Sequence, residues 1–292
     1  MGDINETILN SIRDQICLID KNGEIIFVNE QWNQSVIKNR GDLCSCGLGA
    51  NYIHASRDNT EVHKGLISLM NDKIDVFTHE YDCHIGNVKK WFLMKATKLK
   101  RNDEGIEGAV ICHVNITKQK LFERQLKKYA DTDPLTSLYN RRFFEEKLQE
   151  CARQLHVDDN PVAIIYMDID NFKDINDAFG HAAGDNVLKE LSFLLLEVTK
   201  EDDICARWGG DEFALLLLDA NKNDLTVTAK RILQHVQRLK VPVDSTTINV
   251  YVSIGGGFFS ESMKVDEMLE KVDVALYEAK DKGKNQICIR KE

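Results

Sequence analysis

Three acidic side chains stand where two apolar segments of the chain end, and together they could bind a divalent cation. Asp168 directly follows the apolar run 162–167, whereas Asp211 and Glu212 follow two glycines within 207–213. Taken alone, Asp168 is better explained as a strand end that reaches water, because a charge is costly to bury without a partner. The glycine turn beside the other two acids shifts that balance. If the two segments are neighbouring strands, three hard oxygen donors without His or Cys favour Mg²⁺ or Mn²⁺ over zinc.

The surrounding segments predict the elements that would hold these acids. The unbroken apolar run 162–167 predicts a central strand buried on both faces. Segments 204–207 and 212–218 predict two strands joined by the glycine turn, and the alternation over 248–254 predicts a further strand. Apolar residues at helical spacing predict helices around 144–155, 187–198 and 272–279.

The first part of the chain predicts a second, smaller α+β unit. The apolar runs 15–20 and 24–29 flank an Asn-Gly pair, which is a strong hairpin signal. A helix is expected at 60–71. Three further strands are expected near 74–83, 90–99 and 106–115. Several antiparallel strands with helices on one side are typical of a sensor-sized domain.

The segment 116–130 lies between the two parts and predicts a helix, because it has no Gly or Pro. Phe122, Leu126 and Tyr129 step by four and three residues, which fits a short coiled-coil seam. A solvated linker helix that packs one stripe on a neighbour explains the pattern equally well. Either way this segment is the domain junction.

Composition excludes several classes of protein. The 292 residues are 43% hydrophobic and 29% charged with three prolines, as in ordinary globular proteins. No apolar run approaches the roughly 20 residues of a membrane span, and the N-terminus lacks the features of a secretory signal, so we expect a cytoplasmic protein. Most of the net charge of −9 falls on residues 121–292, which argues against a nucleic-acid surface. The eight cysteines are expected to be reduced thiols.

The segment 207–213, Arg-Trp-Gly-Gly-Asp-Glu-Phe, resembles the signature loop of the GGDEF family, the diguanylate cyclases. Four more segments match that family in order and spacing: 133–142, 168–177, 179–185 and 277–285. The resemblance implies a palm-like (ferredoxin-like, nucleotidyl cyclase) antiparallel sheet flanked by helices. It also implies condensation of two GTP molecules into cyclic di-GMP, with release of two pyrophosphates, by a homodimer of facing half-sites.

The same resemblance implies roles for individual residues. The metal set would be Asp168, the Ile169 carbonyl, Asp211 and Glu212, with Asp211 or Glu212 also helping to deprotonate the attacking ribose 3′-hydroxyl. Lys173 would lie against the triphosphate. Lys280 and Lys284 would contact phosphates, although the family often has Arg at the second position, so the fork geometry of that contact is lost here.

Asn176 and Asp185 resemble the family's guanine-binding residues. An ionised Asp only accepts hydrogen bonds, which suits the guanine N1 and N2 donors and disfavours adenine. Helix capping is the alternative for both residues. His181 is equally consistent with a substrate contact and with a helix-start residue packed on the loop.

The family's inhibitory product site, an Arg-x-x-Asp sequence, is degenerate here. Asp203 is in place, but Lys200 replaces the arginine and offers a point charge instead of a planar fork. We therefore expect weak or absent product inhibition. The alternative role of Lys200 is a favourable cation near the end of a helix.

The N-terminal segment resembles a PAS sensor domain, on the strength of its opening hairpin followed by Glu30-Gln31-Trp32 and of its exit at 108–117. Its unusual feature is a set of thiols and imidazoles: Cys44, Cys46, Cys83, His84, Cys112 and His113. These residues suggest either a metal, haem or redox sensor, or small buried apolar thiols beside ordinary histidines. Their spacing is not that of standard zinc modules. A small-molecule, metal or redox input is expected, with its ligand unknown.

The sequence thus predicts an α+β signalling enzyme with a PAS-like sensor (1–116), a helical coupler (117–132) and a GGDEF diguanylate cyclase domain (133–292). Its expected cofactor is Mg²⁺ or Mn²⁺, and its expected partners are GTP and a second copy of the chain. The rival function is a catalytically silent GGDEF domain that binds GTP or a protein partner. The match at Asp168, Lys173, Asp211 and Glu212 speaks against that rival.

Overall fold

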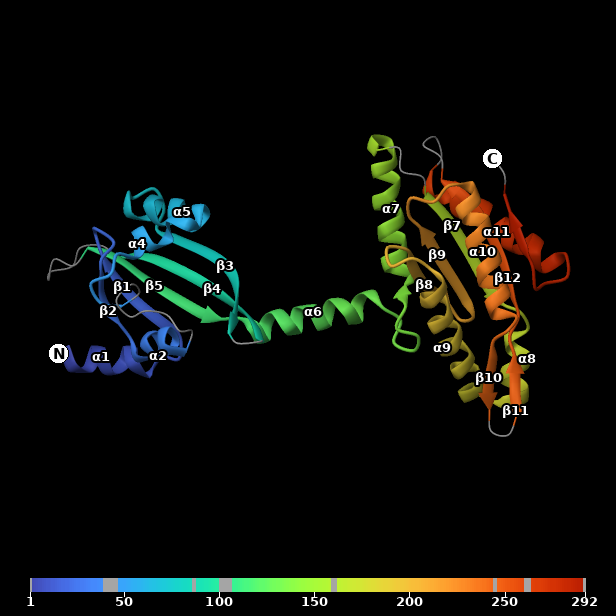
Figure 1. The fold of residues 1–292 in the computed structure, drawn as a ribbon, viewed down its shortest axis with the longest axis horizontal. Coiled ribbons are helices and arrows are strands. Elements are labelled where there is room, and N and C mark those ends of the chain that lie inside the picture. The colour runs from blue at the N-terminus through green and yellow to red at the C-terminus, as the bar shows by residue number, and fades with distance from the viewer. Residues whose placement is uncertain are drawn as a thin grey trace. The chain divides into compact units, whose positions relative to one another are not determined.

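The computed structural model describes residues 2–38, 47–85, 88–99, 107–158, 162–243, 246–259 and 264–290. The chain divides into two compact units, Met1–Gln125 and Leu126–Glu292 (Figure 1). This division falls inside the segment that the sequence predicts as a coupler. Each unit is built on its own sheet and has its own core.

The N-terminal unit contains a five-stranded sheet in the order β2-β1-β5-β4-β3, and every neighbouring pair is antiparallel. Its strands are β1 (Gln15–Asp20), β2 (Ile25–Val28), β3 (Val76–Ile85), β4 (Val88–Leu99) and β5 (Gly108–Asn115). The predicted hairpin joins β1 to β2, and Gly23 at its tip has a φ of 85°. A left-handed residue at this position is the reason the turn needs glycine.

Short helices precede the sheet and connect β2 to β3: α1 (Gly2–Ser11), α2 (Glu30–Lys38), α4 (Tyr52–Ala55), η1 (Ser56–Asp58) and α5 (Thr60–Met70). Trp32 from α2 and Leu66 and Leu69 from α5 share one core cluster with Ile19 and Ile111 from the sheet.

Helix α6 (Thr117–Asp131) begins two residues after β5 ends. Leu121, Phe122, Leu126 and Tyr129 are exposed apolar residues on this helix, with exposed fractions between 49% and 79%. Because these apolar side chains are exposed, they are available to a further contact.

The C-terminal unit contains a six-stranded sheet in the order β13-β12-β7-β9-β8-β6. Its strands are β6 (Tyr139–Asn140), β7 (Val162–Ile169), β8 (Ile204–Gly209), β9 (Glu212–Leu217), β12 (Val252–Phe259) and β13 (Ile287–Ile289). The central strand β7 is buried at every position, as its sequence predicts. The pairs β6–β8 and β12–β13 are parallel, and the other pairs are antiparallel.

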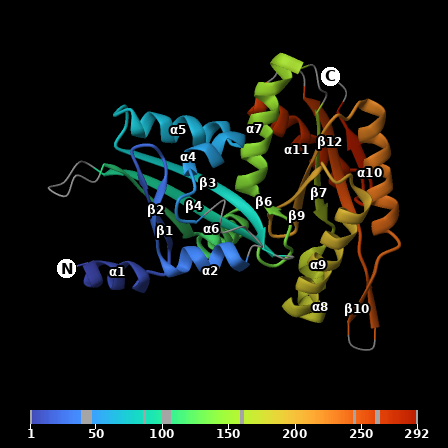
Figure 2. The same ribbon diagram turned by 60° about the vertical axis from the view of Figure 1, so that its left-hand side comes forward.

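Helices cover both faces of this sheet: α7 (Arg141–Asp158), α8 (Phe172–Phe179), α9 (His181–Val198), α10 (Lys222–Val236) and α11 (Val265–Asp281). Odd-numbered residues of β7 pack with α9 and α10, whereas the even-numbered residues Val162, Ile164 and Tyr166 pack with α7 and α11. Figure 2 shows these helices around the strands of the sheet. Side chains alternate along a strand, so Asp168 emerges on the side of α7 and α11.

The strand predicted over 248–254 is divided into two. Residues Thr246–Asn249 form β11, which pairs with β10 (Lys240–Val243) in a separate hairpin, and β12 begins at Val252. The alternating pattern persists across the break because Ile248, Val250 and Val252 are all buried. Gly255 in β12 lies so close to α11 that a Cβ would overlap the backbone of Leu276, so glycine allows the helix to reach the sheet.

Among the described residues, no helix combines the length and apolar character that crossing a bilayer requires.

Candidate active site

The acids predicted from the sequence come from adjacent strands of the C-terminal sheet. Asp168 near the end of β7 lies opposite Glu212 at the start of β9. One step further, the Ile169 amide donates to the Asp211 carbonyl at 3.2 Å. The antiparallel register therefore brings the end of one strand against the tip of the β8–β9 hairpin.

Asp168 is the most buried of the three acids, with 8% of its surface exposed. Burial raises the pKa of Asp168, the charges of Asp211 and Glu212 raise it further, and Lys280 opposes the rise. The Lys280 ammonium lies 2.8 Å from Asp168 Oδ2. A carboxylate crowded by other acids is stabilised by any additional cation, so this end of the sheet favours a positively charged ligand.

The hairpin tip is open above its two glycines. A Cβ built on Gly209 or Gly210 would meet no described atom within 4 Å, and Gly210 has a φ of 54°. Arg207 holds the tip from below, because its Nε and Nη2 donate to the Gly210 carbonyl at 3.0 and 2.7 Å. The loop thus combines a fixed backbone with space for a ligand to approach it.

Asp133 supports this loop through Arg207, whose Nη1 lies 3.2 Å from Asp133 Oδ1. The same carboxylate oxygen accepts from the amide and hydroxyl of Thr136 at 2.8 and 2.7 Å. Burial works against ionisation of Asp133, but the Thr136 hydrogen bonds and Arg207 outweigh it and lower its pKa. The sequence showed Asp133 only as part of a family motif, and the structure gives it a positioning contact.

Asp170 is a second positioning residue that spacing alone did not reveal. It is 7% exposed, accepts from Ser253 Oγ at 2.7 Å and accepts from the Asn285 amide at 2.8 Å. Its own amide donates to the Tyr251 carbonyl. These contacts tie the end of β7 to β12 and to the loop that follows α11.

The loop after α11 places one of the predicted phosphate contacts beside the start of α8. Lys284 Nζ donates to Asn171 Oδ1 at 2.5 Å, and both residues have positive φ. Lys173 is exposed on the first turn of α8. The end of β7 around Asp168 and Asp170 is therefore the meeting point of the segments that carry Lys173, Lys280 and Lys284. This region thus contains cations as well as acids.

The two residues proposed to bind guanine lie inside helices. Asn176 is in α8 and Asp185 is in the second turn of α9, and within the part of the chain described the caps of these two helices make no side-chain cap hydrogen bond. The capping alternative is therefore not supported. A Cβ on Gly184 would overlap Asn176 Oδ1, so the glycine sets the position of that amide. His181 is the exposed first residue of α9, one turn before Asp185.

Lys200 and Asp203 form a turn beyond the end of α9. The Lys200 amide donates to Asp203 Oδ2 at 2.9 Å, and the Leu218 amide donates to Oδ1 at 3.3 Å. Both carboxylate oxygens of Asp203 thus accept local backbone groups. The Lys200 side chain is exposed.

The donors at this site fit a hard cation by type, because they are the carboxylates of Asp168, Asp211 and Glu212 with the nearby Ile169 carbonyl. No three His, Cys, Asp or Glu side chains converge into a ready-made cage within the described ranges. The Asp168 carboxylate is held by Lys280 instead. Lys280 is thus the counter-ion of Asp168 at this end of β7.

The thiols and imidazoles of the N-terminal unit are dispersed. Cys44 and Cys46 lie outside the described residues. Cys83 and His84 are neighbours on β3 and therefore point to opposite faces of the sheet. Burial, and then the charge of Asp82, raises the pKa of the Cys83 thiol, which disfavours the thiolate that binds metals.

Residues 130–286 match the family described as "Diguanylate cyclase, GGDEF domain". This match covers more than half of the chain, and the palm-like sheet with acids at a glycine hairpin is the arrangement just described. The chain belongs to the GGDEF family.

Two curated relatives from Escherichia coli K12 are named for different functions. The chain is 32% identical over 170 residues to the diguanylate cyclase DosC, which covers 58% of this chain and 37% of that protein. It is 35% identical over 184 residues to the cyclic di-GMP phosphodiesterase PdeR, which covers 62% of this chain and 27% of that protein. The chain thus spans well under half the length of either relative.

Two solved structures share the fold of the C-terminal part. The diguanylate cyclase SiaD from Pseudomonas aeruginosa, in complex with its activator SiaC, matches with a TM-score of 0.56 and 31% identity over 59% of this chain and 66% of that one. The coiled coil and GGDEF domain of DgcB from Caulobacter crescentus, in complex with c-di-GMP, matches with a TM-score of 0.57 and 26% identity over 60% and 93%.

Proposed function

We propose that the C-terminal unit is a diguanylate cyclase that condenses two GTP molecules into cyclic di-GMP and releases two pyrophosphates. The observation that carries this proposal is the register of β7 and β9, which sets Asp168 opposite Glu212 beneath an open glycine hairpin. In each of two steps a ribose 3′-oxygen forms a bond to an α-phosphorus, and the bond from that phosphorus to pyrophosphate breaks.

A bound Mg²⁺ or Mn²⁺ would neutralise phosphate charge, and Asp168, the Ile169 carbonyl, Asp211 and Glu212 would hold it. Asp211 or Glu212 would also accept the proton of the attacking 3′-hydroxyl. Phosphoryl transfer depends mostly on positioning and charge neutralisation. Lys173, Lys280 and Lys284 would supply the positive charge around the triphosphate.

Guanine selection is assigned to Asn176 and Asp185. The exposed Asp185 carboxylate would accept from the guanine N1 and N2 donors, and the Asn176 amide would add an acceptor and a donor. His181, one turn before Asp185 on the same side of α9, would contact the nucleotide from the helix start. Gly184 would keep Asn176 in place, because a side chain there would displace its amide.

We further propose a homodimer in which each C-terminal unit holds one GTP and the two half-sites face each other. The exposed Leu126 and Tyr129 of α6 support a helix-to-helix contact. The N-terminal unit would be the PAS-like sensor, and its antiparallel sheet with helices between β2 and β3 is compatible with that role.

The rival function is a silent domain that binds GTP without turnover, and the similarity to a protein named as a phosphodiesterase is the observation that favours it. Incubation of the purified full chain with GTP and Mg²⁺, followed by nucleotide chromatography, separates the two. The enzyme should form one cyclic di-GMP and two pyrophosphates for every two GTP consumed. Saturable GTP binding with no product would establish the silent domain instead.

A further inference from the structure

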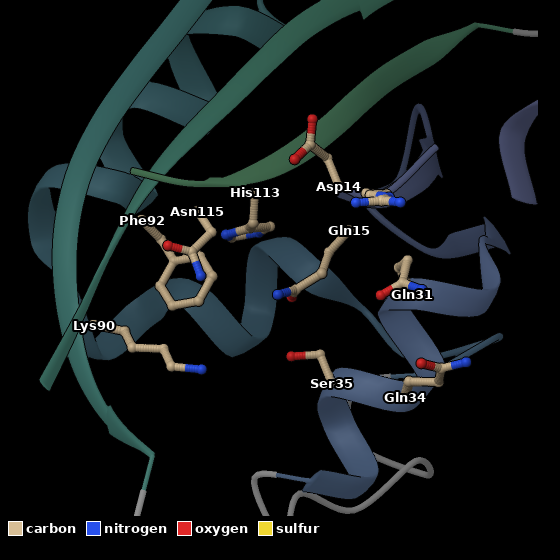
Figure 3. Close-up of a pocket in the computed structure, with 10 residues that line it drawn as sticks. Asp14, Gln15, Gln31, Gln34, Ser35, Lys90, Phe92, His113 and Asn115 are labelled. Atoms are coloured by element: carbon tan, nitrogen blue, oxygen red, sulfur yellow. The ribbon is translucent and has the colours of Figure 1, made fainter. Parts of the chain in front are cut away.

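A cavity of about 200 Å³ lies in the N-terminal unit between α2 and the ends of β1, β4 and β5 (Figure 3). It is smaller than the roughly 300–1,000 Å³ of pockets for drug-sized ligands. One molecule of liquid water takes up about 30 Å³, so the cavity has room for a metabolite as large as several water molecules. Its lining includes polar side chains from α2, β1, β4 and β5.

Three hydrogen-bonding groups point toward one another across this cavity: the Lys90 ammonium from β4, the Gln15 amide from β1 and the Asn115 amide from β5 (Figure 3). Arg13 contributes a second cation to the lining. Asp14 also lines the cavity, but in Figure 3 its carboxylate turns away from Lys90 and Gln15. An ammonium and two amide groups that can each donate an N–H converge here, and such a set can hold an anion.

The wall formed by His113 and Phe92 is neutral and fixed, whereas α2 adds the polar side chains of Gln31, Gln34 and Ser35. His113 is 9% exposed, and burial lowers its pKa to about 4. Its Nε2 lies 3.0 Å from the Tyr52 hydroxyl and its Nδ1 lies 2.6 Å from the Tyr81 hydroxyl. Phe92, 5% exposed, adds an apolar surface. This wall would contact the carbon skeleton of a ligand without competing for its charge.

One residue of the cavity also holds the start of α6. Asn115 Oδ1 accepts from the Thr117 amide at 3.0 Å, so the group that Asn115 can offer to the cavity is its Nδ2 donor. Thr117 Oγ1 accepts from the Trp91 amide, and the Trp91 carbonyl accepts from Ile116. Trp91 lies between Lys90 and Phe92, both of which line the cavity. The cavity and the first turn of α6 therefore share a hydrogen-bonded frame.

We propose that this cavity binds a small organic carboxylate, held by Lys90, Gln15 and Asn115, and that its occupancy stabilises the first turn of α6 through Asn115. A ligand on the Asn115 nitrogen fixes the amide whose oxygen accepts from Thr117, the first residue of α6, and satisfying such a free N–H group stabilises the first turn of a helix. The ligand is thereby linked to the helix that leads into the C-terminal unit. This proposal goes beyond the proposed cyclase activity and does not depend on it.

Calorimetric titration of the full chain tests the binding. The probes are succinate, malate and glutamate, with succinamide as the uncharged analogue of matched size. At least one carboxylate should bind and succinamide should not. Lys90→Gln should weaken binding by about tenfold or more, since it removes the charge-assisted hydrogen bond. Lys89→Gln removes the same charge one position away, where Lys89 instead pairs with Asp82 at 3.2 Å, and should leave the affinity within about twofold.

Asn115→Asp sharpens the test because it keeps the oxygen that caps Thr117 while it replaces the donor by a negative charge. It should abolish carboxylate binding without loss of the folded state. The proposal of an anion site is overturned if no carboxylate binds, if succinamide binds equally well, or if Lys89→Gln weakens binding as much as Lys90→Gln does.

Hydrogen exchange of residues 116–121 tests the link to α6. The bound carboxylate should slow exchange there at least severalfold in the natural chain and leave it unchanged in Lys90→Gln. Binding without any change of exchange in this segment would overturn the link to α6. Neither measurement uses GTP, so a failure of the cyclase proposal would leave both results interpretable.

Discussion

Each unit buries a titratable side chain near the end of a central strand, His113 in one and Asp168 in the other, and burial moves both toward their neutral forms. His113 on β5 is 9% exposed and Asp168 on β7 is 8% exposed. Burial lowers the pKa of His113 to about 4 and raises the pKa of Asp168. The two residues differ in their partners: two tyrosine hydroxyls for His113, and the Lys280 ammonium with two nearby acids for Asp168.

This difference distinguishes His113, which forms a wall of the N-terminal cavity, from Asp168, which belongs to the candidate active site. The two tyrosine hydroxyls satisfy the hydrogen-bonding capacity of both ring nitrogens, so a further charged ligand would not stabilise His113. Asp168 keeps a net excess of negative charge around it even with Lys280 in contact, so a cationic ligand lowers the free energy of the folded state. The partners of a buried group, more than its burial, indicate whether it is structural or functional.

The largest effect is expected at the charged site, on activity. Asp211→Asn keeps the shape of the side chain but removes one anionic donor, so formation of cyclic di-GMP from GTP should fall by about a hundredfold or more. The melting temperature should be nearly unchanged. The exposed Asp202 offers the control, and Asp202→Asn should leave the rate intact. Full turnover by Asp211→Asn would remove this loop from catalysis.

Opposite pH dependence of stability is the direct test of the comparison. The pKa of His113 is lowered from its ordinary 6.5, so its contribution to stability is complete above pH 6.5 and is lost as the pH falls toward 4. The full loss is on the order of 3 kcal/mol. His113→Gln should abolish this acid loss in urea unfolding of the N-terminal unit, followed by Trp32 and Trp91 fluorescence in a Trp208→Phe background.

Asp168 should behave in the opposite sense. Burial raises the pKa of Asp168 above its ordinary value of 3.8. The contribution of Asp168 to the free energy of unfolding therefore falls as the pH rises from 3.8 through the folded-state pKa. Asp168→Asn should therefore gain stability relative to the natural chain near neutral pH and lose that advantage in acid. Parallel pH profiles for Asp168→Asn and His113→Gln would contradict the distinction between the two sites.

Removal of the neighbouring Asp170 carboxylate should lower the stability of the folded state, in contrast to the gain expected for Asp168→Asn. Asp170 accepts from Ser253 and Asn285, and Asp170→Ala would leave both of these donors without their acceptor. This loss of a buried acceptor should cost about 1–3 kcal/mol of unfolding free energy at neutral pH. Ser253→Ala, which removes one donor and leaves the other, is the matched variant and should cost less. An undiminished stability of Asp170→Ala would show that these bonds do not hold the loop.

The exposed helix between the units predicts a smaller, concentration-dependent effect. Leu126→Ala with Tyr129→Ala removes apolar surface from α6, so specific activity at dilute protein should fall severalfold and recover at high concentration. Lys127→Ala with Lys128→Ala on the same helix is the control. Analytical ultracentrifugation should show the corresponding shift toward monomer. A specific activity independent of concentration would reduce α6 to a tether.

The smallest effect is expected at the degenerate inhibitory sequence. Initial rates should change less than about twofold when micromolar cyclic di-GMP is added, because Lys200 lacks the fork of arginine and Asp203 is engaged by backbone amides. Lys200→Arg should restore measurable inhibition. Strong inhibition of the natural chain, abolished by Lys200→Ala, would show that the lysine suffices.

Much of the C-terminal unit could be predicted because its signals are local. The buried run before Asp168 and the two glycines before Asp211 each fit within a few residues, and the structure places them on adjacent strands. The contacts that position the site are not local. Asp170 and Asn285 are 115 positions apart, and Lys284 and Asn171 are 113 apart. No pattern in a single sequence links such pairs, because a strand end finds its partner only after the sheet has formed.

The N-terminal unit shows the same limit more strongly. The sequence determined its hairpin, its strands and the helix that follows, since alternation and turn residues act over short distances. Gln15, Lys90 and Asn115 carry no shared motif, and only the order β2-β1-β5-β4-β3 brings their strands to one cavity. The sequence by itself therefore determined the elements and the acids of the signature loop. The tertiary structure decided which polar groups face each other, because that depends on strand order and register.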